Sequence, residues 1–468
     1  MQRRELMKGL AGGLTLGLLG CGTRRPTSLQ RADVVVVGAG LAGLAAAHAL
    51  QAGGARVVVL EAGDRVGGRL HTVERNGLRF ELGGVEVGTG YERVHAHAQR
   101  VGVGIVPPTV ARPSAGDMGL VFGDSIVRAT EWADSPFNVL EGRERGLLPP
   151  ALLQAALAAL ALPSADAWRD PARHALDVPL AQHLAVQGWS SQAISWMDIG
   201  NAYSSLHGIS ALDALRRDAL RRHGSPGTGW IDGGSQALPE AMAASLDQRP
   251  LIRAHVEVVH ADGRGVTVRC ADGRRFAAAH VVMAVPSGPL SRIRFEPAPP
   301  APQHATWAAR RSNAVTTIHL QPTRKFWEAD GQPLWLWGTG PLQRVMAVTG
   351  VDGEVNRLIV WLNGAMAEEA DRLDRSARMA WTIAAMERLR PASAGTLLPL
   401  ETRSWGSDPL ADGAFSEIAP GRFAETLAWD ARPLGHIHFA GEQTELGVPG
   451  MEAAVTSGER AAEAILVA

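Results

Sequence analysis

The chain has few of the residues on which several common protein classes depend. Cysteine occurs twice among 468 residues, as Cys21 and Cys270, so a disulfide-stabilised scaffold is excluded. Lysine also occurs twice, as Lys8 and Lys325, and arginine carries nearly all of the positive charge. The formal net charge is −1 and no run of like charges stands out. The sequence therefore argues against a nucleic-acid-binding protein, because such proteins present a basic surface.

Motifs for metal or nucleophilic catalysis are missing as well. The chain contains no HExxH pair, no paired CxxC and no GxSxG elbow. These absences argue against a zinc protease, a zinc-ribbon module and an α/β-hydrolase.

The N-terminus has the pattern of an export signal. Arg3 and Arg4 precede an apolar run over residues 10–20, as in twin-arginine signals. The run is too short to span a membrane, which takes about 20 apolar residues. It ends in Leu-Leu-Gly-Cys, which resembles a bacterial lipobox with Cys21 as the lipid acceptor. We expect a protein exported by the twin-arginine route, either periplasmic or membrane-anchored as a lipoprotein; simple cleavage or retention of the segment is the alternative.

The sequence after a polar tether, residues 22–31, predicts a βαβ unit. Residues 34–37 are four valines, and residues 41–51 are rich in alanine and apolar on several sides. This pattern predicts a buried strand followed by a buried helix. Residues 56–60 predict a second strand, so the unit begins a parallel sheet.

A glycine-rich turn joins the first strand to the helix. Gly38, Gly40 and Gly43 form G-x-G-x-x-G, and Glu61 follows at the end of the second strand. Such a turn lets the backbone approach a pyrophosphate at the N-terminus of a helix, and the acid accepts a hydrogen bond from a ribose hydroxyl. The sequence therefore predicts a dinucleotide site.

The rest of the chain divides by pattern. Residues 131–222 predict a helical insertion that is either a substrate cap or scaffold. Residues 229–290 contain a glycine pair, a helix and hairpins around Asp-Gly turns. Cys270 lies in a predicted strand of one hairpin, where we expect a packed thiol. The last 70 residues return to a strand and a long final helix.

Several segments resemble the flavin-containing amine oxidases, the family of monoamine, polyamine and L-amino-acid oxidases. EAGDRVGGR at residues 61–69, ELGG at 81–84, IDGGSQALP at 231–239, HFAGE at 438–442 and GMEAAVTSGERA at 450–461 carry the resemblance. It implies FAD as the cofactor. The residues that it places at FAD are Gly38, Gly40, Leu41, Ala42, Gly43, Glu61, Ala62, Gly68, Arg69, Gly83, Gly84, Val256, Trp405, Gly441, Glu442, Gly450 and Met451.

The resemblance also predicts the architecture. We expect an α/β protein with a Rossmann-like FAD-binding domain built from residues 32–90, 229–290 and 400–468. An α+β substrate domain of mixed sheet and helices would comprise residues 91–228 and 291–399, with the signal at 1–21 and the tether at 22–31.

Some residues depart from the family pattern. Ala414 stands where covalently flavinylated members have a cysteine, so the FAD is expected to be non-covalent. Phe415 matches one of two aromatic residues that frame the substrate amine, but Gly450 replaces the other.

Two further positions bear on catalysis. Thr316 or Thr317 stands where many members have a lysine that assists reaction with oxygen, which suggests another electron acceptor, an exported quinone or cytochrome. Glu86 lies where members place a substrate-facing side chain; a carboxylate there suits a cationic amine and disfavours α-amino acids, although a solvated or internally paired glutamate is an equal alternative.

The sequence thus predicts FAD-dependent oxidation of a small-molecule amine: a hydride passes from the carbon next to nitrogen to the flavin, and the imine is hydrolysed. Phe415, Thr316, Thr317 and Glu86 are the candidate catalytic residues. The alternatives are a flavin-dependent dehydrogenase or desaturase of a carbon-carbon bond, and a decayed flavoprotein that binds a partner. Contact with a membrane is expected only through the lipid at Cys21.

Overall fold

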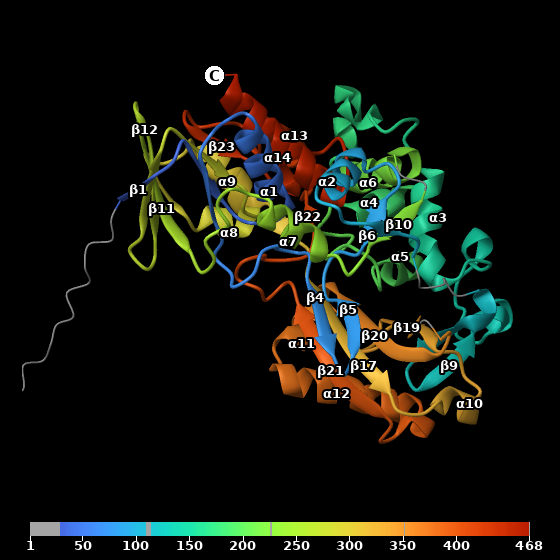
Figure 1. Cartoon of the computed structure of the whole chain (residues 1–468). Helices are drawn as coiled ribbons and strands as arrows, with labels where there is room; N and C mark the ends of the chain where they lie inside the picture. Colours follow the sequence, from blue (N-terminus) through green and yellow to red (C-terminus); the bar gives the residue numbers. More distant parts are fainter. Residues whose placement is uncertain (1–28, 109–113, 225–226, 351, 468) are drawn as a thin grey trace, which may run out of the picture.

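The computed structural model describes residues 29–108, 114–224, 227–350 and 352–467 (Figure 1). The export signal, the lipid acceptor Cys21 and tether residues 22–28 lie outside the described residues. In the part that is described, no helix combines the length and the apolar character needed to cross a membrane.

A parallel four-stranded sheet carries the glycine turn. Its order is β23 (Ile437–Phe439), β14 (His280–Met283), β2 (Val34–Val37) and β3 (Val57–Leu60). All four valines of β2 are buried, which explains why this run has no polar alternation. The strands come from distant parts of the chain, so the sheet is assembled from discontinuous segments, as predicted.

Two helices cover one face of this sheet (Figure 1). They are α1 (Leu41–Ala52) and α14 (Gly450–Leu466), and α7 (Ala237–Ala244) packs beside α1. A side chain at Gly458 would meet the carbonyl oxygen of Ala42 at 2.1 Å. Glycine therefore allows α14 to approach α1 closely.

A five-stranded sheet packs on the other face. Its order is β1 (Leu29–Arg31), β13 (Arg275–Ala278), β12 (Gly265–Cys270), β11 (Val256–Asp262) and β15 (Arg294–Glu296). β11, β12 and β13 pair antiparallel through tight turns, as the Asp-Gly signals predict. Cys270 is 1% exposed and unpaired, and burial raises the pKa of its thiol to about 11, which agrees with a packed thiol.

A seven-stranded sheet lies below these layers in Figure 1. Its order is β21 (Leu397–Ser404), β17 (Val315–Pro322), β20 (Val355–Asn363), β19 (Arg344–Thr349), β18 (Trp335–Gly338), β8 (Met118–Phe122) and β9 (Ser125–Arg128). The helices α11 (Gly364–Asp371) and α12 (Arg375–Leu389) cover one face, where Ile318 and Leu320 pack against them. Because side chains alternate along a strand, the odd-numbered residues of β17 point to the opposite face.

The helical region that the sequence predicts contains α3 (Leu152–Ala159), α4 (Leu180–Val186), α5 (Ser191–Met197) and α6 (Ala211–Gly224). It surrounds its own apolar core, which includes the tryptophans Trp132, Trp168, Trp189 and Trp196. Near it, β6 (Glu86–Gly88), β10 (Thr228–Ile231) and β7 (Ile105–Val106) form a small antiparallel sheet.

The shorter elements connect these layers. The hairpin of β4 (Thr72–Arg75) and β5 (Leu78–Glu81) packs against the seven-stranded sheet, since Phe80 stacks on His319 and Arg75 pairs with Glu401. The others are the strand pair β16 (Arg311–Ser312) and β22 (Ser416–Glu417), and the helices α2 (Glu92–Arg100), α8 (Ser287–Ser291), α9 (Ala301–Ala309), α10 (Phe326–Asp330) and α13 (Phe423–Trp429).

Three of the expected domain boundaries fall inside elements. The boundary after residue 228 lies in β10, the one after 290 lies in α8, and the one before 400 lies in β21. Residues 400–404 consequently belong to the seven-stranded sheet. Turn residues in the sequence locate a boundary only to within a few positions. A strand can continue past such a residue where the neighbouring strand offers hydrogen-bond partners.

Candidate active site

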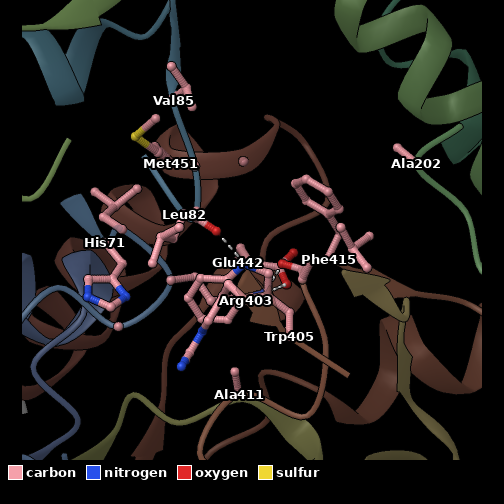
Figure 2. A pocket seen from close by; sticks show the side chains of 18 of the residues that line it. His71, Leu82, Val85, Ala202, Arg403, Trp405, Ala411, Phe415, Glu442 and Met451 are labelled. Atoms are coloured by element: carbon pink, nitrogen blue, oxygen red, sulfur yellow. Dashed lines mark hydrogen bonds and ion pairs between the residues drawn. The ribbon is translucent and has the colours of Figure 1, made fainter. Parts of the chain in front are cut away.

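One large cavity joins the glycine turn to the seven-stranded sheet. Its volume is about 2950 Å³, and its lining includes both Gly38 of the glycine turn and Trp337 of β18. Figure 2 shows part of it, with Phe415 projecting into the space between the segments that carry Leu82 and Ala202. Of the cofactor residues that the resemblance implies, all except Gly43 line this cavity.

The glycine turn has the geometry of a phosphate cradle. Gly38 has φ +104°, and a side chain at Gly43 would meet the Gly38 carbonyl oxygen at 1.9 Å, so both positions require glycine. Gly40 has open space where a Cβ would lie. α1 starts immediately after Gly40 without a side-chain cap. Its first N–H groups, in Leu41 and Ala42, are therefore oriented to bind a phosphate.

Glu61 stands beside this turn. Its carboxylate accepts hydrogen bonds from the backbone N–H groups of Ala39 at 2.8 Å and Gly63 at 2.7 Å. Each carboxylate oxygen has a second lone pair, so Glu61 remains able to accept from a ribose hydroxyl. Ala62 and Val256 line the neighbouring wall, where the resemblance places the adenosine half of FAD.

Arg69 and Glu442 form an ion pair next to the turn. Arg69 Nη1 lies 2.9 Å from Glu442 Oε1 and also donates to the Ala414 carbonyl at 3.0 Å. Ser416 donates to Glu442 through its backbone N–H and its hydroxyl. Burial raises the pKa of Glu442, but Arg69 and these hydrogen bonds outweigh burial and hold that pKa below its usual value. Glu442 is therefore a fixed negative charge.

Backbone segments form the platform expected for the flavin ring. A Cβ at Gly83 would lie 2.0 Å from the Arg69 carbonyl oxygen and 3.0 Å from the Trp405 ring. Trp405 Nε1 donates to the Leu82 carbonyl at 2.8 Å (Figure 2). These contacts fix the Gly83–Gly84 segment against Trp405.

The last helix begins at this platform. α14 starts at Gly450, with φ +54° and no side-chain cap, and Met451 lines the cavity. A side chain at Gly450 would lie 3.3 Å from the hydroxyl of Tyr91. Tyr91 thus borders the position where the second aromatic residue is missing, although it comes from a different segment.

Phe415 is placed in the cavity by its backbone. Its N–H donates to Asn313 Oδ1 at 2.7 Å, and the Asn313 N–H donates to its carbonyl at 2.9 Å. The ring is 39% exposed, although phenylalanine is usually buried. This exposure to the cavity fits a substrate-contacting role.

The two threonines of β17 face opposite ways, and the assignment of Thr316 as a catalytic residue is wrong. Thr316 is fully buried on the helix-covered face, where its hydroxyl donates to Asp371 at 2.7 Å. Thr317 lines the cavity, is 6% exposed, and has a buried hydroxyl with no protein partner among the described residues. The alternation of a strand explains the difference, so Thr317 alone occupies the cavity-facing position.

Glu86 lies in the part of the cavity wall that the small sheet forms. It begins β6 opposite Trp230, is exposed, and lines the cavity. The structure thus gives Glu86 access to a ligand, and its role in binding an amine stays a prediction.

Several cavity residues lie outside the predicted site. Tyr91 and Tyr203, the only tyrosines of the chain, both line the cavity, and burial raises the pKa of each to about 12. Arg357 and His319, 38 residues apart, meet in the wall. Tyr203 could be proposed from the sequence as a cavity residue, although such a ring is more often part of the core, whereas no pattern in the sequence brings Arg357 to His319.

Comparisons with known proteins agree with this geometry. The model of the flavin containing amine oxidoreductase family matches residues 41–466, and the chain therefore belongs to this family. It is an FAD-dependent oxidoreductase. Within the described residues, no group of three or more His, Cys, Asp or Glu side chains is arranged to hold a metal ion.

Individual relatives cover nearly the whole chain. AofH of Mycobacterium tuberculosis, provisionally designated a flavin-containing monoamine oxidase, is 28% identical over 92% of this chain and 95% of its own. The L-amino-acid oxidase of Mus musculus is 28% identical over 96% of this chain and 72% of its own.

Two solved structures show a similar fold. A cofactor-binding variant of putrescine oxidase has a TM-score of 0.76 and 25% identity, with 94% of this chain and 100% of that chain covered. Cyclohexylamine oxidase from Brevibacterium oxydans has a TM-score of 0.72 and 24% identity, with 93% and 99% covered. At that identity the second similarity concerns the fold alone.

Proposed function

We propose that the protein oxidises a small amine to the imine, which water then hydrolyses to a carbonyl compound. The main support is the continuity of one cavity from the dinucleotide turn, past the Gly83–Gly84 platform, to Phe415 and Glu86. Names of similar proteins point the same way, because they include monoamine, putrescine and cyclohexylamine oxidases.

The residues of the chain would position the reactants. When bound, FAD supplies the two-electron acceptor for the hydride that leaves the carbon next to nitrogen. Glu86 attracts the cationic amine from solvent, and Phe415 offers an apolar face against which the reacting carbon can rest. The amine loses its proton to solvent before the hydride leaves, because the nitrogen lone pair forms the imine bond. The uncapped N-terminus of α14 would stabilise negative charge on the bound cofactor.

We propose that the FAD is held without a covalent bond. Ala414, whose carbonyl accepts from Arg69, has no nucleophile in its side chain. The glycine cradle, Glu61 and the Arg69–Glu442 pair would hold the cofactor instead. Acid denaturation of the purified protein should release all of the yellow colour into the supernatant; colour retained by the protein would contradict this.

We propose that an acceptor other than oxygen reoxidises the flavin. The support is Thr317, which brings an uncharged hydroxyl to a cavity position where many relatives have a lysine. An exported quinone or cytochrome would suit the export that the N-terminal pattern predicts. Fractionation of cells that express the full chain, with and without Cys21→Ser, tests export and lipid anchoring.

The test of amine oxidation uses the protein without residues 1–21. It is mixed without oxygen with primary, secondary and polyamines and with α-amino acids, while the flavin absorbance is followed. We expect one class of amines to bleach the band and α-amino acids to leave it unchanged. If no amine bleaches a fully loaded protein, a carbon-carbon dehydrogenase or a partner-binding flavoprotein becomes the better assignment.

A further inference from the structure

Arg357 on β20 is a buried cation in the cavity wall. It is 9% exposed and lies on the face of the seven-stranded sheet that lines the cavity. Its guanidinium lies 4.5 Å over the ring of Phe80, and its Nη1 donates to His319 Nδ1 at 3.1 Å. These are its only polar or ring contacts within the described part of the chain.

Arg357 differs from the other buried arginines in having no carboxylate partner. Among the described residues, the other four buried arginines each form an ion pair, as the pairs Arg216–Asp213, Arg310–Asp430, Arg390–Asp330 and Arg378–Asp371. An unpaired charge in a protein interior costs several kcal/mol. Arg357 therefore calls for a counter-ion that the protein does not supply.

The nearby carboxylates are committed to other groups. Glu81 influences the charge of Arg357 but forms no ion pair with it in the described structure, and its carboxylate accepts hydrogen bonds from Thr72 and Ser235. Glu401 is paired with two other arginines of the hairpin and of α12. Burial lowers the pKa of Arg357 to about 10, with Glu81 acting in the opposite direction. The guanidinium thus remains charged at neutral pH.

His319 holds Arg357 in place as a neutral hydrogen-bond acceptor. Burial and the charge of Arg357 hold its pKa well below the usual range, so the imidazole is neutral. Because Nδ1 accepts from Arg357, the ring proton must sit on Nε2. His319 is 1% exposed, and its Nε2 is buried with no acceptor in the described structure. This N–H points away from Arg357, because the two ring nitrogens face different sides of the imidazole, so the guanidinium is the donor that the cavity offers.

We propose that Arg357, held in place by His319, binds a carboxylate of the substrate, at the end of the molecule away from the oxidised carbon. This inference rests on the proposed amine oxidation. The guanidinium of Arg357 contacts His319, which is two residues from Thr317 on the same face of β17, about 7 Å at ordinary strand spacing. Several carbons must therefore separate the amine and the carboxylate.

This separation selects a class of substrate. An α-amino acid carries its two charged groups on one carbon and cannot reach both ends. A straight-chain ω-amino acid places its amine near Glu86 and the flavin, and its carboxylate at Arg357. Glu86 and Arg357 then give the cavity charges of opposite sign that match the two ends.

The test compares two series of amines without oxygen. One series is the ω-amino acids from glycine to 8-aminooctanoate, and the other is the n-alkylamines of equal length. We expect the rate of flavin bleaching to rise with chain length in the first series, and a long ω-amino acid to exceed its alkylamine by about tenfold or more, as one charge-assisted hydrogen-bond pair supplies. Equal rates in the two series would overturn the proposal.

Substitutions assign the effect to Arg357. In Arg357→Met, and in Arg357→Gln should the first variant lose FAD, the rate ratio between the matched ω-amino acid and alkylamine should fall to about one. Arg264→Met, which removes an exposed arginine from the turn between β11 and β12, should keep the ratio. An unchanged ratio in the Arg357 variants would contradict the inference.

A binding measurement separates this inference from the proposed function. Calorimetry with octanoate and octanamide on the FAD-loaded protein should show a preference for the carboxylate that the Arg357 variants lose. If no amine bleaches the flavin but this preference is present, amine oxidation fails and the anion site stands. If amines bleach the flavin but octanoate binds no better than octanamide, the anion site fails and amine oxidation stands.

Discussion

At the scale of single residues, Thr317 is the position with the clearest consequence. It faces the cavity between Trp361 on β20 and Arg403 on β21, and its hydroxyl has no protein partner among the described residues. The strand alternation that sends Thr316 to Asp371 leaves Thr317 as the cavity-facing side chain. The pattern of residues 314–320 predicts a strand, but both faces of that strand are apolar enough to be buried. The sequence therefore does not show which alternate residues face the cavity, and the fold decides it.

A lysine at this position should change the reaction with oxygen. In Thr317→Lys we expect reoxidation of the reduced flavin by oxygen to accelerate by about tenfold or more, because a cation stabilises the negative charge that oxygen acquires. Stopped-flow mixing of the reduced variant with aerated buffer measures this rate.

The control for this prediction is Thr317→Met, which adds similar length without charge. It should react with oxygen as slowly as the unmodified protein. Equal acceleration in both variants would show that volume rather than charge is responsible, and no acceleration in Thr317→Lys would remove the argument for a different acceptor.

At the scale of elements, the crossing of α1 and α14 decides whether the cofactor site forms. The first turns of both helices line the cavity. The contact between the helices therefore sets the N-terminus of α1 at the phosphate site relative to the N-terminus of α14 at the flavin site. Gly458 permits the contact, since a Cβ there would lie 2.1 Å from the Ala42 carbonyl oxygen, a backbone atom that cannot move without moving α1.

Gly458→Ala should therefore loosen this crossing. We expect a loss of about 1–3 kcal/mol in the free energy of unfolding, as overpacking of a close contact costs, together with weaker retention of FAD. Thermal unfolding and the ratio of flavin to protein absorbance measure the two effects. Gly263→Ala is the matched control, because its Cβ would meet no atom within 4 Å; an equal loss in both variants would contradict the prediction.

At the scale of the whole molecule, buried histidines make the protein sensitive to acid. Burial lowers the pKa of His438 from 6.5 to about 4, and His280, His436 and Arg460 act in the same direction. Burial also lowers the pKa of His71 to about 4, with help from Arg65 and Arg403. Asp430 opposes them, because burial raises its pKa to about 6 despite Arg310.

The directions of these pKa shifts define the pH range over which the stability changes. A histidine whose pKa is depressed by folding binds its proton more readily in the unfolded chain, so stability falls as pH decreases from about 6.5 to about 4. Asp430 and three other carboxylates whose pKa is raised gain stability over part of that range, but six histidines have a lowered pKa and outweigh them. We expect the melting temperature to decrease between these pH values.

His438→Gln should flatten this decrease, by at most about 2–3 kcal/mol in unfolding free energy near pH 4. Melting curves from pH 4 to pH 8 for both proteins measure the difference. Parallel curves over the whole range would mean that His438 does not titrate on unfolding.

The sequence by itself determined the cofactor half of the site. The glycine turn, Glu61, Gly83–Gly84 and the start of α14 are local strand-turn-helix patterns, and local backbone geometry follows from residue type. The departures at Ala414 and Gly450 were likewise readable, because each stands inside a recognisable motif.

Only the tertiary structure decided the substrate half. Which threonine of β17 faces the cavity, how Tyr91 comes to border Gly450, and how Arg357 meets His319 all depend on strand register and on contacts between distant segments. Such contacts arise from packing across sheets, for which no short pattern exists in the chain. The same physics explains why FAD can be predicted from the sequence, whereas the carboxylate site had to be found in three dimensions.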